Sequence, residues 1–265
     1  MSSPPDHFVV YGDVLGFRDL VLTHKTVQAD TLTYRRQNAR LMVASLEHGN
    51  PLQRRLKNFH LKVDEAVFNT KWPAEVSVMV FSDSLFLATT DGKSCMEFCQ
   101  RLLTECLAAD IPLRMGVGYG SFISNSFAFE SVPLARVINT QFLGTAVVYA
   151  NDAEKALKGL RIALHPSSVE PLGHLQLRYD RRLPLPSEQV NEHVSHEWNI
   201  LPSERNDSGG GLRMQREALI RHVEKMRSDS LDRPDIQLHY SRTLSAIQQM
   251  MFQTHQEWLK PGVRT

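Results

Sequence analysis

Two aspartates stand where strands are expected to end, and carboxylates are the side chains that hold divalent cations. Asp13 closes the apolar run VVY and is followed at once by the tight apolar corner VLGF. A carboxylate at the end of a buried strand is costly unless a cation meets it, although it can also cap the next helix. Asp83 lies in the triplet SDS between two β-rich runs, EVSVMVF and LFLATT, which predict a hairpin with Asp83 at its tip. Two carboxylates that are held together need a divalent cation or a shared proton.

The order of the elements decides whether these two carboxylates meet. A strand over 8–13 precedes a segment over 18–60 with a helical pattern, and then comes the hairpin. Ser94 and Glu97 predict a capping box that opens a second helix, Pro112 stops it, and LRMGVGYG resumes as a strand. The expected core contacts of the first helical segment are Leu20, Val21, Leu41, Met42 and Leu46. This β-α-β-β-α-β order is the ferredoxin-like arrangement of the α+β class, in which the first strand lies beside the hairpin and Asp13 can approach Asp83.

The C-terminal part differs in composition. After the segment FLGTAVVYANDAEKALKGLRIAL, which predicts a helix and a strand, the chain becomes rich in Pro, His and Arg. The stretch SERNDSGGGLR, at 203–213, has the composition of a flexible linker, and 213–227 and 236–259 have amphipathic helical patterns. We therefore expect a catalytic domain over 1–165 and an extension over 166–265 that packs on it.

The overall composition excludes several classes of protein. Of 265 residues, 42% are hydrophobic and 22% charged, and the net charge of +1 gives no reason to expect nucleic-acid or membrane binding. No apolar run approaches the roughly 20 residues of a transmembrane helix, and MSSPPDHF lacks a signal sequence, so we expect a soluble cytoplasmic protein. Cys95, Cys99 and Cys106 have the spacing of a buried helix face in a reducing compartment.

Four motifs in order resemble those of the class III nucleotidyl cyclases. They are DVLGF, the hairpin FSDS with Ser82 where the family more often has Gly, RMGVGYG, and FLGTAVVYANDAEK. The similarity covers roughly residues 8–165, and within the family the chain resembles the bacterial Pycsar pyrimidine cyclases. That resemblance implies a lyase that makes cyclic UMP or cyclic CMP as an antiphage second messenger, and a homodimer with its active site at the subunit interface. A separate effector would then respond to the cyclic nucleotide.

The chemistry of cyclisation assigns expected roles to the residues of these motifs. The 3′ oxygen of a nucleoside triphosphate attacks the α-phosphorus and pyrophosphate leaves, which two Mn²⁺ or Mg²⁺ ions assist. We expect metal ligands from Asp13, Asp83 and the Val14 carbonyl, and a triphosphate cradle from the backbone N–H groups around Leu15, Gly16 and Phe17. Arg18 can add charge there. Arg114 is the candidate for contacting phosphate or the opposite subunit, with a structural ion pair as its alternative role.

Two further comparisons with the family concern the base and the transition state. Positions that read a purine in the family correspond to Met79 and Gln141, and methionine cannot pair with a purine edge, whereas Gln141 can both donate and accept. Together with the resemblance to the pyrimidine cyclases, these two residues lead us to expect UTP as the substrate, with CTP as its close competitor. The usual transition-state Asn and Arg correspond to Val148 and Asp152, which leaves open a catalytically silent nucleotide-binding or dimerisation protein. An arginine of the 35–57 region or Arg114 is the alternative source of the missing cation.

Overall fold

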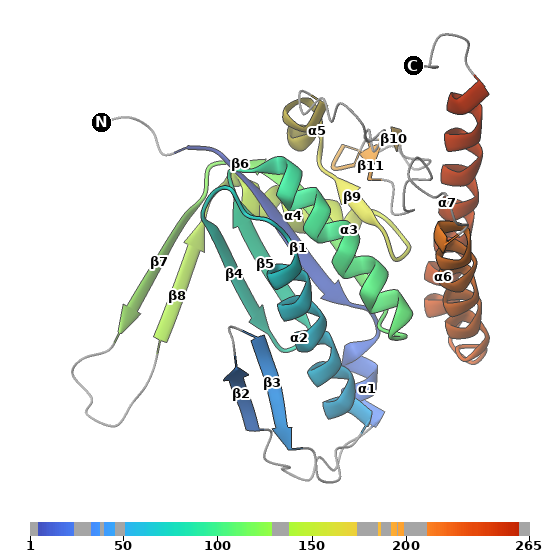
Figure 1. Cartoon of the computed structure of the whole chain (residues 1–265), viewed down its shortest axis with the longest axis horizontal. Helices are drawn as coiled ribbons and strands as arrows, with labels where there is room; N and C mark the ends of the chain where they lie inside the picture. The colour runs from blue at the N-terminus through green and yellow to red at the C-terminus, as the bar shows by residue number, and fades with distance from the viewer. Residues whose placement is uncertain are drawn as a thin grey trace.

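The chain is described by a computed structural model that covers residues 5–23, 33–37, 40–45, 51–128, 138–173, 185–186, 192–194, 196–198 and 211–259 (Figure 1). Its first part contains a strand, a short helix, a small hairpin and a long helix: β1 (His7–Val14), α1 (Phe17–Thr23), β2 (Thr33–Gln37), β3 (Arg40–Ser45) and α2 (Pro51–Asn69). The centre contains the second hairpin, a helix and three strands: β4 (Val76–Phe81), β5 (Ser84–Thr89), α3 (Gly92–Ala108), β6 (Leu113–Gly120), β7 (Ile123–Ala128) and β8 (Ile138–Leu143). The remaining elements are α4 (Thr145–Ala156), β9 (Ile162–Leu164), α5 (Pro166–Gly173), β10 (Leu185–Pro186), β11 (His196–Glu197), α6 (Gly211–Ser228) and α7 (Pro234–Leu259).

The main sheet confirms the predicted α+β class and its ferredoxin-like order. Its seven strands run in the order β10-β11-β9-β6-β1-β5-β4. Within it, β1 is antiparallel to both β5 and β6, and β4 is antiparallel to β5, whereas β9 joins β6 in parallel. The quartet β6-β1-β5-β4, with α2 and α3 as its connections, is the β-α-β-β-α-β unit. Asp13 therefore stands on a central strand, beside the hairpin that carries Asp83.

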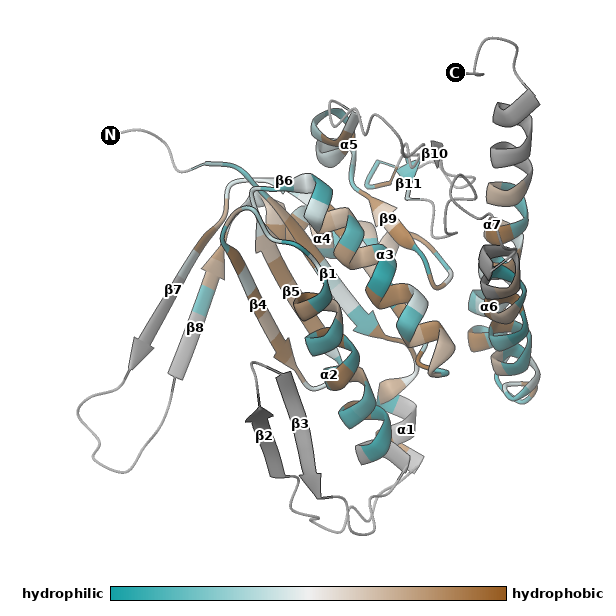
Figure 2. Ribbon diagram, in the orientation of Figure 1, coloured by the Kyte–Doolittle hydropathy of each residue, from teal (hydrophilic) through white to brown (hydrophobic). Residues whose placement is uncertain are grey.

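Alternation along the strands divides the core between the two faces of the sheet. One face carries Val10, Leu85 and Leu87, which pack with Phe59 of α2 and Phe98 of α3 in the large apolar cluster. The opposite face carries a smaller cluster under α4, formed by Val9, Ala88, Phe122, Ala146 and Ala150. In Figure 2 the strands β4 and β5 are largely brown, while α2 and α6 carry many teal residues. The three cysteines, Cys95, Cys99 and Cys106, are free and buried on α3, as expected.

The C-terminal helices pack against the same core as the sheet. Leu219 and Val223 of α6 and Tyr240 and Ile247 of α7 belong to the large apolar cluster of α2, α3 and the sheet. The two predicted helices are confirmed, although α6 starts at Gly211, inside the expected linker. The rest of that linker lies outside the described residues. Among the helices that the structure describes, none combines the length and the apolar character needed to cross a bilayer.

Two sequence predictions about secondary structure are wrong. The segment 18–60 is not continuously helical, because the antiparallel pair β2 and β3 stands between α1 and α2. Val21, an expected core contact, is 37% exposed, whereas the side chains of the other four expected contacts lie outside the described residues. The capping box is also absent: α3 starts two residues earlier than predicted, and its N-cap is Asp91, whose carboxylate accepts the Ser94 N–H at 2.8 Å.

Candidate active site

Asp13 and Asp83 meet at one end of the sheet, where β1 and the β4–β5 hairpin finish. The register places Asp13 opposite Ser84 on one side and Arg114 on the other. Asp83 belongs to the two-residue turn between β4 and β5, and its carbonyl accepts the Val14 N–H at 3.0 Å. The backbone that follows Asp13 is thereby tied to the backbone of Asp83.

The turn that carries Asp83 is held in a strained conformation by a neighbouring helix. Ser82 has a φ of 53°, in the left-handed region that a residue with a Cβ adopts only at a cost. The Nε2–H of His60, on α2, donates to the Ser82 carbonyl at 2.8 Å. A glycine would adopt this φ without strain, which is the physical difference between Ser82 and the residue that the resembling family more often has.

One pocket of about 210 Å³ contains both aspartates. The rest of its lining comes from the turn after β1, from the start of α1 and from the beginning of α7: Val14, Leu15, Gly16, Phe17, Arg18, Arg233, Asp235 and Ile236. Three parts of the chain that are far apart in the sequence, 13–18, Asp83 and 233–236, thus line one pocket. The predicted convergence of Asp13 and Asp83 is present in the geometry.

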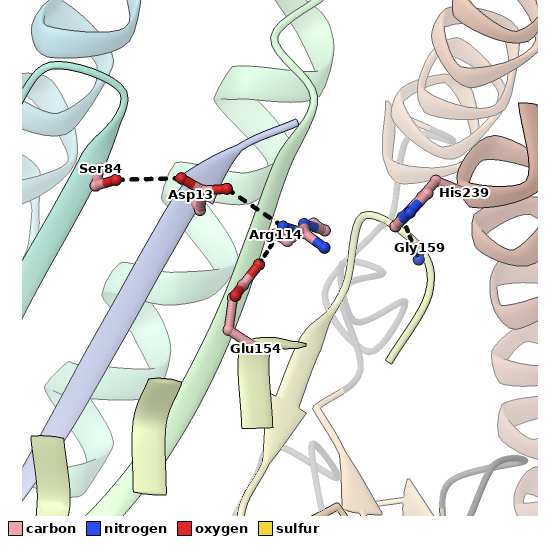
Figure 3. Close-up of polar contacts among 6 residues, drawn as sticks. All are labelled: Asp13, Ser84, Arg114, Glu154, Gly159 and His239. Carbon is pink, nitrogen blue, oxygen red and sulfur yellow. Dashed lines mark hydrogen bonds and ion pairs between the residues drawn. The ribbon is translucent and has the colours of Figure 1, made fainter. Parts of the chain in front are cut away.

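A chain of polar contacts leads away from Asp13 across the sheet (Figure 3). The Ser84 hydroxyl donates to one carboxylate oxygen of Asp13 at 3.1 Å, and the Arg114 guanidinium donates to the other at 3.2 Å. The same guanidinium lies 2.6 Å from the carboxylate of Glu154 on α4. The side chains of Asp13 and Arg114 are 24% and 17% exposed, whereas that of Glu154 is 2% exposed. Arg114 therefore has the ion pair that was its alternative role, and it links the metal candidate Asp13 to a buried carboxylate.

Close packing of α4 on β6 explains why Glu154 is buried. The strand presents glycines to the helix, and a Cβ added at Gly116 would lie 2.1 Å from the Ala150 carbonyl oxygen. A Cβ added at Gly118 would lie 2.7 Å from the Ala146 carbonyl oxygen. Only glycine permits this approach, which brings the last turn of α4 down to the level of Arg114.

Burial and like charge raise the pKa values of Asp83 and Glu154. Burial raises the pKa of Asp83, and the neighbouring Asp13 charge raises it further. The pKa of Glu154 rises to about 7, because burial outweighs the opposing effect of the Arg114 guanidinium. The site therefore favours the addition of positive charge near Asp83.

The donor set fits a divalent cation that takes part of its coordination from a bound substrate. Asp13 and Asp83 offer hard carboxylate oxygens to one pocket, and no described residue supplies a competing thiolate or imidazole there. Across the part of the chain that the structure describes, no three His, Cys, Asp or Glu side chains are grouped closely enough to hold a metal by themselves. Phosphate oxygens would have to complete the coordination sphere.

The predicted phosphate cradle lies in the same pocket, with one change. Leu15, Gly16 and Phe17 all line it, but the Leu15 N–H donates to the Pro112 carbonyl at 2.7 Å and is engaged within the protein. Gly16 has a φ of 76°, so the turn depends on glycine at this position. Arg18 is exposed and lines the pocket as well.

The two predicted base-contacting residues lie in different places. Met79 pairs with Phe86, which pairs with Tyr11, so its side chain stands on the face of the sheet that carries Asp13. Tyr11, Phe81 and Phe142 each contact the Phe86 ring there, with centroids 4.7, 6.0 and 4.8 Å away. Gln141 is exposed on β8, and alternation along this strand points it away from Phe86.

The positions that replace the usual transition-state pair both lie on α4. Val148 is 55% exposed, and Asp152 is partly exposed one turn further along. Among the cations of the 35–57 region, Arg55 lines a larger cleft of about 490 Å³ next to the turn at Leu15 and Gly16. The side chains of Arg35, Arg36 and Arg40 lie outside the described residues.

Comparisons with known proteins give structural similarities only. No protein-family profile matches the chain, and no curated protein sequence matches it. It is similar to the guanylyl cyclase domain of the RhoGC fusion protein from the aquatic fungus Blastocladiella emersonii, with a TM-score of 0.49 and 13% identity over 75% of this chain and 97% of that one. It is also similar to the adenylyl cyclase CyaB of P. aeruginosa, with a TM-score of 0.47 and 13% identity over 77% of this chain and 97% of that one. At these values, the residues of the site carry the functional proposal.

Proposed function

We propose that the protein is a nucleotidyl cyclase that converts UTP to 3′,5′-cyclic UMP and pyrophosphate. The observation that carries the proposal is the meeting of Asp13 and Asp83 in one pocket with the Gly16 turn and Arg18. The attack of a 3′ hydroxyl on an α-phosphorus requires carboxylates that hold the metal ions and a turn that binds the phosphates. A protein without this activity has no evident need to hold two like charges at the end of a sheet.

Each residue of the pocket has a role in this reaction. Asp13, Asp83 and the Val14 carbonyl would hold two Mn²⁺ or Mg²⁺ ions, which lower the pKa of the attacking hydroxyl and neutralise phosphate charge when bound. The Gly16 and Phe17 amides and the Arg18 guanidinium orient the leaving phosphates. Ser84 fixes the Asp13 carboxylate through its 3.1 Å hydrogen bond. When substrate binds, the Arg114 guanidinium either gives up its contact with Asp13 or keeps it while it also contacts phosphate. The ion pair with Glu154 holds Arg114 at the site in both cases.

The proposed preference for a pyrimidine rests on the face of the sheet that carries Met79. The rings that surround Phe86 on that face, Tyr11 and Phe142, suit stacking of a base, and neither ring nor Met79 offers a purine edge a charged partner. Within one chain Gln141 points away from Phe86, so we assign the polar contact with the base to Gln141 of a second copy, whose amide would meet the carbonyl and N–H of uracil, or cytosine after turning. CTP is the competing substrate.

The active unit in this proposal is a homodimer. The open face beside the site exposes large apolar side chains, including Phe81 at 49% and Val148 at 55%. A second copy would cover these residues and bring its own arm, β7 and β8, toward the base.

In the cell, we propose that the cyclic nucleotide acts as an antiphage second messenger for a separate effector.

A silent nucleotide-binding protein is the second candidate, because Val148 and Asp152 supply neither the amide nor the guanidinium of the transition-state pair. One assay separates the two. Purified protein is incubated with each of the four nucleoside triphosphates and Mn²⁺, and cyclic nucleotide and pyrophosphate are quantified. The proposal predicts equimolar cyclic UMP and pyrophosphate from UTP. Cyclic AMP or cyclic GMP as the main product would overturn the pyrimidine preference, and no product from any triphosphate would favour the silent protein.

A further inference from the structure

The turn between α6 and α7 forms one wall of the pocket that contains Asp13 and Asp83. Arg233, Asp235 and Ile236 line it from this turn and from the start of α7. Arg233 and Ile236 also line the adjoining 490 Å³ cleft, so the two hollows share this wall. A segment of the C-terminal extension is thus built into the candidate active site.

Four sets of contacts fix this wall. The carbonyl of Arg233 accepts the Gln237 N–H at 2.9 Å, and its own N–H donates to Ser230 at 3.0 Å. Ile236 packs over the turn after β1, with its Cδ1 3.1 Å from the place of a Cβ on Gly16.

The other two sets anchor the helices on either side of the turn. On α7, His239 accepts the Gly159 N–H at 3.0 Å and Thr243 accepts the Leu160 N–H at 2.7 Å. On α6, Lys225 lies 2.5 Å from the Asp110 carboxylate. Figure 3 shows the His239 contact on the α7 side of the site. A wall anchored at this many points holds its side chains in place rather than swinging over the pocket.

Arg233 is the cation that this wall supplies. Its guanidinium lies 3.5 Å from the Asp235 carboxylate, and its side chain is 33% exposed. It shares the pocket with Arg18, which comes from α1. Guanidinium groups bind phosphate oxygens through paired N–H donors. They are more weakly hydrated than ammonium groups, so excluding water from them costs less free energy.

We infer that Arg233 is a substrate-binding residue that contacts the terminal phosphates of the nucleoside triphosphate, within the same chain that supplies Asp13 and Asp83. The inference rests on the proposed function for the identity of the substrate. Asp235 holds the guanidinium at the pocket in the absence of substrate and competes with phosphate for it. The extension is then part of the substrate site. Asp152 occupies the position of the usual transition-state arginine, and Arg233 supplies a cation at the leaving phosphates instead.

Binding of Mn²⁺ with inorganic tripolyphosphate tests this assignment without requiring turnover. Affinities are measured by calorimetry for the unaltered protein, Arg233→Gln, Arg233→Lys and Asp235→Asn, with Arg227→Gln as a matched control from the exposed end of α6. We expect Arg233→Gln to weaken binding about tenfold or more, Arg233→Lys to weaken it less, and Arg227→Gln to leave it within about twofold. Asp235→Asn should tighten binding, and this gain should shrink in the Arg233→Gln background because the two residues are coupled.

The outcomes separate this inference from the proposed function. Unchanged tripolyphosphate affinity in a folded Arg233→Gln variant would overturn the inference, even if the enzyme makes cyclic UMP. Absence of tripolyphosphate binding by the unaltered protein would overturn it as well. Binding that depends on Arg233 would support it even in a protein that cyclises no nucleotide, in which case only the proposed reaction fails. Melting curves for every variant show whether a loss of affinity reflects unfolding.

Discussion

The imidazole of His239 on α7 accepts a hydrogen bond from the backbone N–H of Gly159, at 3.0 Å and 80 positions away in the sequence. The acceptor must be an unprotonated ring nitrogen, so this contact exists only while His239 is neutral. Burial lowers the pKa of His239 to about 4, and the Arg114 and Lys158 charges act in the same direction.

This contact predicts a loss of stability in mild acid. Between pH 6.5 and about 4 an unfolded chain protonates His239 whereas the folded protein does not, so the contribution of His239 to the free energy of unfolding falls as the pH drops through this window. The raised pKa of Glu154 contributes with the opposite sign. The shift of His239 corresponds to up to about 3 kcal/mol. Below pH 4 both states carry the proton, and this contribution is fully lost.

His239→Asn provides the test by urea denaturation at several pH values. The asparagine oxygen can accept the Gly159 N–H and takes no proton, so we expect the variant to lose less stability than the unaltered protein when the pH falls from 6.5 to 4. His193→Asn, at a side chain 44% exposed, is the control and should keep the original slope. An unchanged slope in His239→Asn would show that another group is responsible.

Under the proposed function, Asp13→Asn and Asp83→Asn should each abolish turnover, because each removes a carboxylate that we assign to the metal ions with almost no change in volume. Their effects on stability should differ. Asp83 is a disfavoured carboxylate in the fold, so Asp83→Asn should melt at the same or a higher temperature. Asp13→Asn loses the contact with Arg114 and should melt slightly lower. Glu75→Gln, at an exposed position before β4, is the control for activity, and substantial cyclase activity in either aspartate variant would contradict the metal assignment.

The strained turn at Ser82 predicts a stabilising substitution. Ser82 has a φ of 53°, which glycine adopts without strain. The free energy of unfolding should therefore be roughly 1 kcal/mol higher for Ser82→Gly than for Ser82→Ala. Both variants lose the hydroxyl, so the comparison isolates the Cβ. Chemical denaturation measures the difference, and equal stability of Ser82→Gly and Ser82→Ala would mean that His60 and the hairpin impose no strain.

The approach of α4 to β6 predicts that Gly116→Ala is severely destabilising, by about 3 kcal/mol or more, because the added Cβ meets backbone rather than a movable side chain. Gly173→Ala is the matched control, since nothing lies within 4 Å of its added Cβ. Thermal melting compares the two. A small effect at Gly116 would mean that α4 can move away from the sheet, and Glu154 would then lose its contact with Arg114.

The strands that carry the site could be predicted from sequence, because their signals are local. The run before Asp13, the hairpin around Asp83 and the strand that starts before Arg114 each combine apolar alternation with turn residues, and all three have nearly the predicted bounds. The pair β2 and β3 was missed because TYRRQ offers no apolar alternation that distinguishes a short strand from a helix.

The other participants depend on tertiary contacts that no local pattern indicates. Glu154 lies at the site only because α4 descends onto glycines of β6, although the spacing of Ala146, Ala150 and Glu154 opposite a Gly-x-Gly strand is a signal that could be sought. Arg233 reaches the pocket because the extension folds back over the end of β1, and nothing in its neighbouring sequence marks it.

The shared apolar cluster makes the sheet and the extension a single cooperative unit. Val223 and Ile247 are completely buried in the apolar cluster that also contains Leu103 and Leu107 of α3, so removal of the last two helices would expose part of this cluster to water. We expect Asp13, Asp83 and the C-terminal helices to melt together, in one transition, and a protease that cuts between them to release no stable smaller domain. Local damage to α6 or α7 should therefore unfold the pocket around Asp13 and Asp83 without any change at the two aspartates themselves.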